Sequence, residues 1–137
     1  MEKVVNLVVI VHGDSVQANF YPYEARIDKS DKEPRINWLV RVIWTDSEKL
    51  PQGLQVSVQD FAALTAATPV SPYGTHSPTF TGQPQPAGVN ELIWLIPGET
   101  VTSIPPEFEE FAWRYNIVVG SDDQVLHSID PLVVISG

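Results

Sequence analysis

The chain has 137 residues, of which 43% are apolar and 18% are charged, a length that suits one domain and hardly two. It contains no cysteine, which excludes disulfides, thiol catalysis and thiolate metal sites. The formal net charge of −9 argues against binding to DNA, RNA or an anionic membrane surface.

The apolar run VVNLVVIV at residues 4–11 could be mistaken for a targeting or membrane segment. It is shorter than the roughly 20 residues that a membrane-spanning helix needs. It also lacks the small-residue cleavage site of a signal peptide. Its many β-branched residues instead predict a buried first strand, and we expect a cytoplasmic protein.

Alternation of apolar and polar residues predicts β-strands along most of the chain. The predicted strands cover residues 3–11, 16–27 with a break at Pro22, 36–44, 54–60, 91–96, 111–119, and 124–136 with an interruption at Pro131. The predicted core consists of Trp38, Val40, Val42, Trp113, Tyr115 and Ile117. About seven or eight strands without a helical period predict an antiparallel β-sandwich of immunoglobulin-like build.

A long loop is expected at residues 61–90, which contain no Asp, Glu, Lys or Arg. Neither flanking part has enough strands to close a sandwich alone, so we expect a loop inside a single domain spanning residues 1–137. One interpretation is a proline-rich excursion on the surface. The other is that Tyr73, His76 and Phe80 contact a neutral ligand or a partner subunit.

The chain has three histidines, and two of them lie near an aspartate. His12 is two residues from Asp14, and His127 is three residues from Asp130. If the first and last strands were adjacent, these four residues could bind a metal ion or relay a proton. A single histidine at a strand end is more often a hydrogen-bonded structural residue, and this remains the main alternative.

Motifs for common chemistries are missing from the sequence. It has no P-loop, dinucleotide-binding fingerprint, calcium loop or G-x-S-x-G motif, so we expect no cofactor and no metal, and an enzyme is not favoured. Pro131 cannot donate a hydrogen bond to a neighbouring strand, which predicts a bulge or a change of pairing at Asp130.

Two dipeptides, Glu33-Pro34 and Asp130-Pro131, together with the short, acidic, β-rich chain, resemble the small bacterial DP-EP family of unassigned function. The segment VVIVHGDSVQANFYP and the closing DPLVVI are similar to the ends of AidA/PixA-type inclusion-body proteins, with Tyr21 as an extra residue before Pro22. The similarity covers about a quarter of the chain. It implies a β-sandwich and self-association, and it supplies no catalytic residue.

Three functions are compatible with these patterns. The first is a non-catalytic β-sandwich that forms homo-oligomers or binds a partner protein. The second is a binding module for a neutral ligand such as a carbohydrate. The third is an enzyme that uses His12 or His127 with Asp14 or Asp130.

Overall fold

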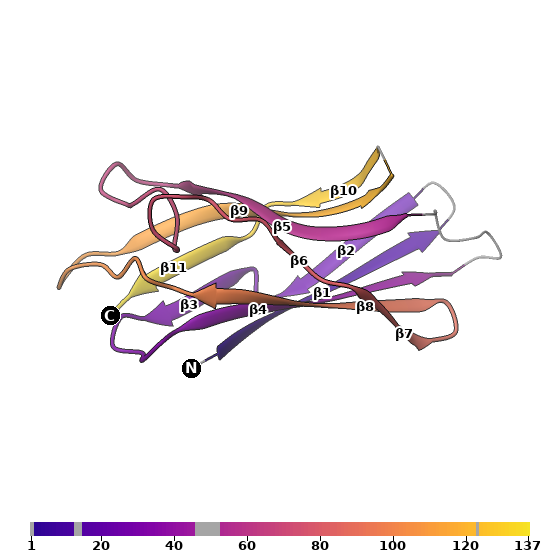
Figure 1. Ribbon diagram of the computed structural model, residues 1–137, viewed down its shortest axis with the longest axis horizontal. Helices are drawn as coiled ribbons and strands as arrows, with labels where there is room; N and C mark the ends of the chain where they lie inside the picture. Colours follow the sequence, from indigo (N-terminus) through magenta and orange to yellow (C-terminus); the bar gives the residue numbers. More distant parts are fainter. Residues whose placement is uncertain (1, 13–14, 46–52, 123) are drawn as a thin grey trace.

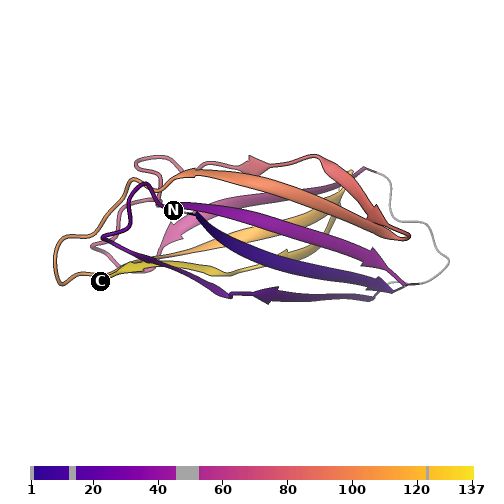
Figure 2. The ribbon, with the colours of Figure 1, turned by 90° about the horizontal axis from the view of Figure 1, so that it is seen from below.

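The chain folds into two β-sheets that pack face to face (Figures 1 and 2). The computed structural model describes residues 2–12, 15–45, 53–122 and 124–137. Sheet A has the order β2 (Ser15–Tyr21), β1 (Glu2–His12), β4 (Arg35–Trp44), β8 (Glu91–Thr100) and β7 (Pro84–Gly88). Sheet B has the order β3 (Glu24–Asp28), β11 (Leu132–Ser136), β9 (Phe111–Ser121), β5 (Leu54–Ala63) and β6 (Phe80–Thr81), and β10 (Gln124–Ile129) also pairs with β9.

The predicted all-β sandwich is confirmed, but both sheets are mixed. β1 is parallel to β4 and β3 is parallel to β11, whereas the other pairs among the described strands are antiparallel. The break predicted at Pro22 separates β2 from β3, and the chain changes sheets there. The immunoglobulin-like arrangement remains a prediction.

The predicted core residues are all buried between the sheets. Trp38, Val40 and Val42 point inward from β4, and Trp113, Tyr115 and Ile117 point inward from β9. The indole nitrogen Nε1 of Trp38 donates a hydrogen bond to the Tyr115 hydroxyl, 3.0 Å away in the opposite sheet. The contact satisfies a donor that would otherwise be buried without a partner.

The long uncharged loop is anchored in the core at a few positions, while many of its other residues are exposed at the surface as the first interpretation expected. Tyr73 and Phe80 are only 6% and 8% exposed and belong to the core. The Trp113 indole donates to the carbonyl of Pro69 at 2.9 Å, and the Ser103 hydroxyl donates to that of Ser71 at the same distance. The absence of charge lets this segment pack into the end of the sandwich without burying an unpaired ion.

Of the two outcomes predicted at Asp130, the bulge is absent and the change of pairing is present, because β10 ends at Ile129 beside β9 alone and β11 begins at Leu132 with β3 as a second neighbour. β10 and β11 pair with β9 in one continuous register, since Ile129 lies opposite Ile117 and Leu132 lies opposite Arg114. The register shift lies earlier, between residues 125 and 127. The strand is interrupted at residues 130 and 131, as predicted, and the Pro131 carbonyl still accepts a hydrogen bond from the Tyr115 amide at 3.1 Å.

The apolar run at residues 4–11 is part of β1, which pairs with β2 on one side and β4 on the other. In the part of the chain that the structure describes, no helix has the length and apolar character needed to cross a membrane.

Two buried tyrosines provide a matched test of the core. Tyr115→Phe removes the acceptor of the Trp38 indole and should lower the free energy of unfolding by about 1–3 kcal/mol. Tyr73→Phe should be neutral or slightly stabilising, because the Tyr73 hydroxyl is buried without a hydrogen-bond partner among the described residues. Urea unfolding followed by tryptophan fluorescence measures both. Equal losses in the two variants would contradict this assignment.

The loop offers a second test. The charge-free, proline-rich sequence suggested that residues 74–86 could be removed without loss of the fold, whereas the buried position of Phe80 predicts the opposite. Phe80→Ala should cost about 3–5 kcal/mol, and deletion of residues 74–86 should abolish cooperative unfolding. His76→Ala in the same segment is the control, and this exposed residue should change stability by less than about 0.5 kcal/mol. Thermal unfolding followed by circular dichroism distinguishes these outcomes.

Candidate functional site

The strands that carry His12 and His127 belong to different sheets and do not pair with each other. His12 ends β1 in sheet A, where its Nδ1 lies 2.6 Å from the Thr45 hydroxyl. His127 is on β10, which pairs with β9 in sheet B. Asp14 lies outside the described residues. The adjacency on which a shared metal or proton-relay site depended is therefore absent from the described strands.

Asp130 acts through its main chain in this structure. The Asp130 main-chain carbonyl accepts a hydrogen bond from the Tyr23 hydroxyl at 2.9 Å. Asp130 itself is exposed at the surface. Within the described ranges, no group of three or more His, Asp or Glu side chains lies close enough together to hold a metal ion. Of the described polar residues singled out from the sequence, His12 and His127 thus lie on strands of different sheets.

The three loop residues are divided between core and surface. Tyr73 and Phe80 pack against each other with ring centroids 5.1 Å apart, and only His76 is exposed. Burial raises the pKa of the Tyr73 hydroxyl far above its usual value, and burial does the same for the pKa of Tyr115. Both phenols therefore stay protonated at neutral pH, and neither ring is available to a ligand at the surface.

The outer face of sheet A is the feature that the site predictions missed. Four rows of residues cross β1, β4 and β8 on the side away from the core. We call these twelve positions the sheet A face: Val4, Asn37 and Pro97; Asn6, Leu39 and Leu95; Val8, Arg41 and Ile93; Ile10, Ile43 and Glu91. Eight of the twelve are apolar, so this side of the sheet resembles a core surface more than a solvated one.

Exposure differs across the sheet A face. Leu95 is 55% exposed and Val4 is 47% exposed, while Val8, Leu39 and Ile93 are half-buried among their neighbours. The inward sides of β1, β4 and β8 are already apolar and packed in the core. Strands that are apolar on both sides are typical of sheets covered on both faces, and only one face is covered by the described chain.

The two charged residues within the sheet A face form an ion pair with each other. Arg41 Nη1 lies 2.8 Å from Glu91 Oε1, and the two side chains are 44% and 20% exposed. The pair leaves the face without net charge. This contrasts with the formal charge of −9 on the whole chain.

One edge of sheet A is protected against the addition of another strand. The Trp44 amide donates to the carbonyl of Asn90 at 3.1 Å, which fixes the direction of the main-chain groups in β4 and β8. Along β8, the main-chain groups of alternate residues point to opposite neighbouring strands, so Leu92 and Trp94 direct theirs toward β4. Pro86 and Pro84 lie opposite these two residues and therefore direct their nitrogens away from β8. These prolines cost no ladder hydrogen bond and remove the donors that an added strand would need.

Comparisons of the chain with protein families, curated proteins and solved structures find no match.

Proposed function

We propose that the protein is a non-catalytic β-sandwich that self-associates, with the sheet A face as the interface between two copies. The observation that carries this proposal is the apolar character of both sides of β1, β4 and β8. An apolar surface that spans three adjacent strands is a feature of interaction sites and is uncommon on monomers.

Charge supports a second copy as the occupant. Two chains with a net charge of −9 repel each other over most of their surfaces, so contact is favoured where the local charge is zero. In a two-fold symmetric interface, each patch meets an identical patch. Arg41 of one copy can then face Glu91 of the other, and the pair on each copy complements the pair on its partner.

The resemblance to the DP-EP family and to AidA/PixA-type proteins agrees with this proposal, because it implies a β-sandwich that self-associates. The Glu33-Pro34 dipeptide has a structural role here, since the Pro34 carbonyl accepts from the Val101 amide at 2.7 Å. A bacterial, cytoplasmic protein is the setting that the resemblance and the burial of residues 5, 7 and 9 within β1 favour.

Leu95 provides the direct test of the interface. Leu95→Lys places a charge in the sheet A face without opening a cavity, because this side chain is already more than half exposed. The wild-type protein should sediment as a dimer of about 30 kDa, twice the 15.2 kDa of one chain, and Leu95→Lys should be monomeric at the same concentration. Val70→Lys is the matched control, since Val70 lies in the loop and is 56% exposed.

A wild-type protein that stays monomeric at millimolar concentration would contradict the proposal. A dimer that persists in Leu95→Lys would instead assign self-association to another surface, such as the outer edge of β2, which no described strand covers. Circular dichroism of both lysine variants should match the wild type.

Charge exchange tests the symmetry of the interface. Arg41→Glu places two carboxylates side by side in each copy and should raise the dimer dissociation constant about tenfold or more. The double variant Arg41→Glu/Glu91→Arg reverses the pair and should restore most of the affinity. Sedimentation equilibrium of the three proteins measures these constants, and a double variant as weak as the single one would exclude a role for the pair.

A further inference from the structure

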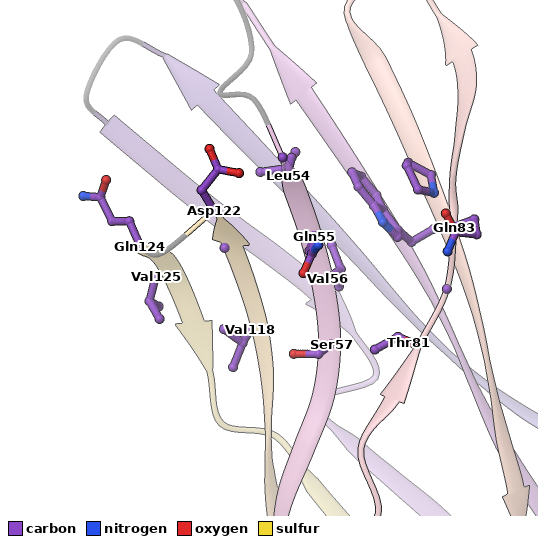
Figure 3. Close-up of a pocket in the computed structure, with 15 residues that line it drawn as sticks. Leu54, Gln55, Val56, Ser57, Thr81, Gln83, Val118, Asp122, Gln124 and Val125 are labelled. Atoms are coloured by element: carbon purple, nitrogen blue, oxygen red, sulfur yellow. The ribbon is translucent and has the colours of Figure 1, made fainter.

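A groove of about 580 Å³ crosses the outer side of sheet B, on the sheet opposite the sheet A face. Figure 3 shows its lining in strand order: Gln124 and Val125 from β10, Val118 from β9, Gln55 and Ser57 from β5, then Thr81 and Gln83. Its volume lies within the range of about 300–1,000 Å³ that is common for ligand sites.

Two glycines in the lining allow close approaches of the backbone beside the groove. Gly120 is in the lining on β9, and a Cβ atom there would lie 3.2 Å from the Gln124 carbonyl oxygen. Gly82 lies where the chain leaves β6 for sheet A, and a Cβ atom there would lie 2.5 Å from the Leu95 carbonyl oxygen. The chain can therefore pass close to β8 at Gly82. Gln83 and Pro84 then form the side of the groove opposite β10.

The polar side chains of the groove are amides and hydroxyls. Gln55, Gln83 and Gln124 each offer two donors and an acceptor, and Ser57 and Thr81 add hydroxyls. Among the described residues that line the groove, Asp122 is the only charged one, and none of them is a cation that could bind a phosphate or carboxylate. This inventory suits a ligand without charge that carries many hydroxyl groups.

We infer that the groove binds a neutral oligosaccharide. The amides of Gln55, Gln83 and Gln124 hydrogen-bond to sugar hydroxyls, and Val118 and Val125 contact the C–H faces of the rings. Trp94, the only aromatic residue among the described lining residues, is fully buried and offers no surface for stacking. Binding therefore depends on hydrogen bonds made in competition with water, and we expect dissociation constants in the millimolar range.

The test is a titration of ¹⁵N-labelled protein with maltohexaose and with xylohexaose. Saturable shifts are expected for the amides of Gln55, Ser57 and Gly120 with at least one of these sugars. Gln83→Ala should weaken binding at least fivefold. Gln85→Ala should leave it unchanged, because Gln85 is also an exposed glutamine, two residues further on and outside the lining.

The absence of shifts with both sugars at 20-fold excess over about 1 mM protein would overturn the inference, as would equal binding by Gln83→Ala and Gln85→Ala. A capped, uncharged pentapeptide serves as the alternative probe, since amides also recognise peptide groups. Binding of the peptide but neither sugar would assign the groove to polypeptides and reject the sugar. The Leu95→Lys variant should retain sugar binding, which separates this inference from the proposed self-association.

Discussion

The contact between Trp38 and Tyr115 is the interaction on which the rest of this sandwich depends. It joins the central strands of opposite sheets, β4 and β9. It also pairs the indole N–H of Trp38 with the hydroxyl of Tyr115, two polar groups that are buried away from solvent. Phe61 stacks on Tyr115 with centroids 5.1 Å apart, and Phe80 stacks on Trp38 at 5.6 Å. Strands β4, β5, β6 and β9 thus meet in one aromatic cluster, and the position of each ring fixes that of the next.

The chain also ties the two sheets together at both sides of the sandwich. On one side, β2 ends sheet A and β3 ends sheet B, and the two are joined across Pro22. On the other side, β6 ends sheet B and β7 ends sheet A, and the crossover at Gly82 joins them (Figure 1). The long loop that leads into this crossover is therefore part of the closure of the core. Tyr73 and Phe80 of this loop belong to the core, although many of its other residues are exposed.

The alternation of apolar and polar residues predicted those features of the fold that depend on neighbouring residues in the sequence. Alternation identified β4, β5 and β9 and the direction of Trp38 and Trp113, because one side of each strand is in the core. The parallel pairing of β1 with β4 was not predictable, since it depends on which distant strand lies alongside. The groove was not predictable either, because Gln55, Gln83 and Gln124 come from three separate segments.

The sheet A face is a different case, because its signal was present in the sequence and the site predictions did not use it. Leu39 and Ile43 alternate with the core residues of β4, so the period of two placed them on the outer side of the strand. Their position was right, but a solvated outer side would carry polar residues there. An apolar residue in the outward phase of three neighbouring strands is therefore evidence for a partner surface, and alternation alone does not reveal it.

The two outer faces of the molecule differ in a way that fits one assembly. Because prolines border β7, growth by edge pairing is hindered at that edge, and association through a face remains open. If two copies meet through the sheet A face, their sheet B grooves point away from each other, one on each side of the dimer.

A ligand chain long enough to reach both grooves, or a surface that displays many copies of the ligand, would then be held at two sites. The apparent affinity of such a dimer can exceed that of a single groove by a factor of roughly 10²–10⁴. The proposed weak binding in each groove and the proposed self-association through the opposite sheet are thus compatible with a common function.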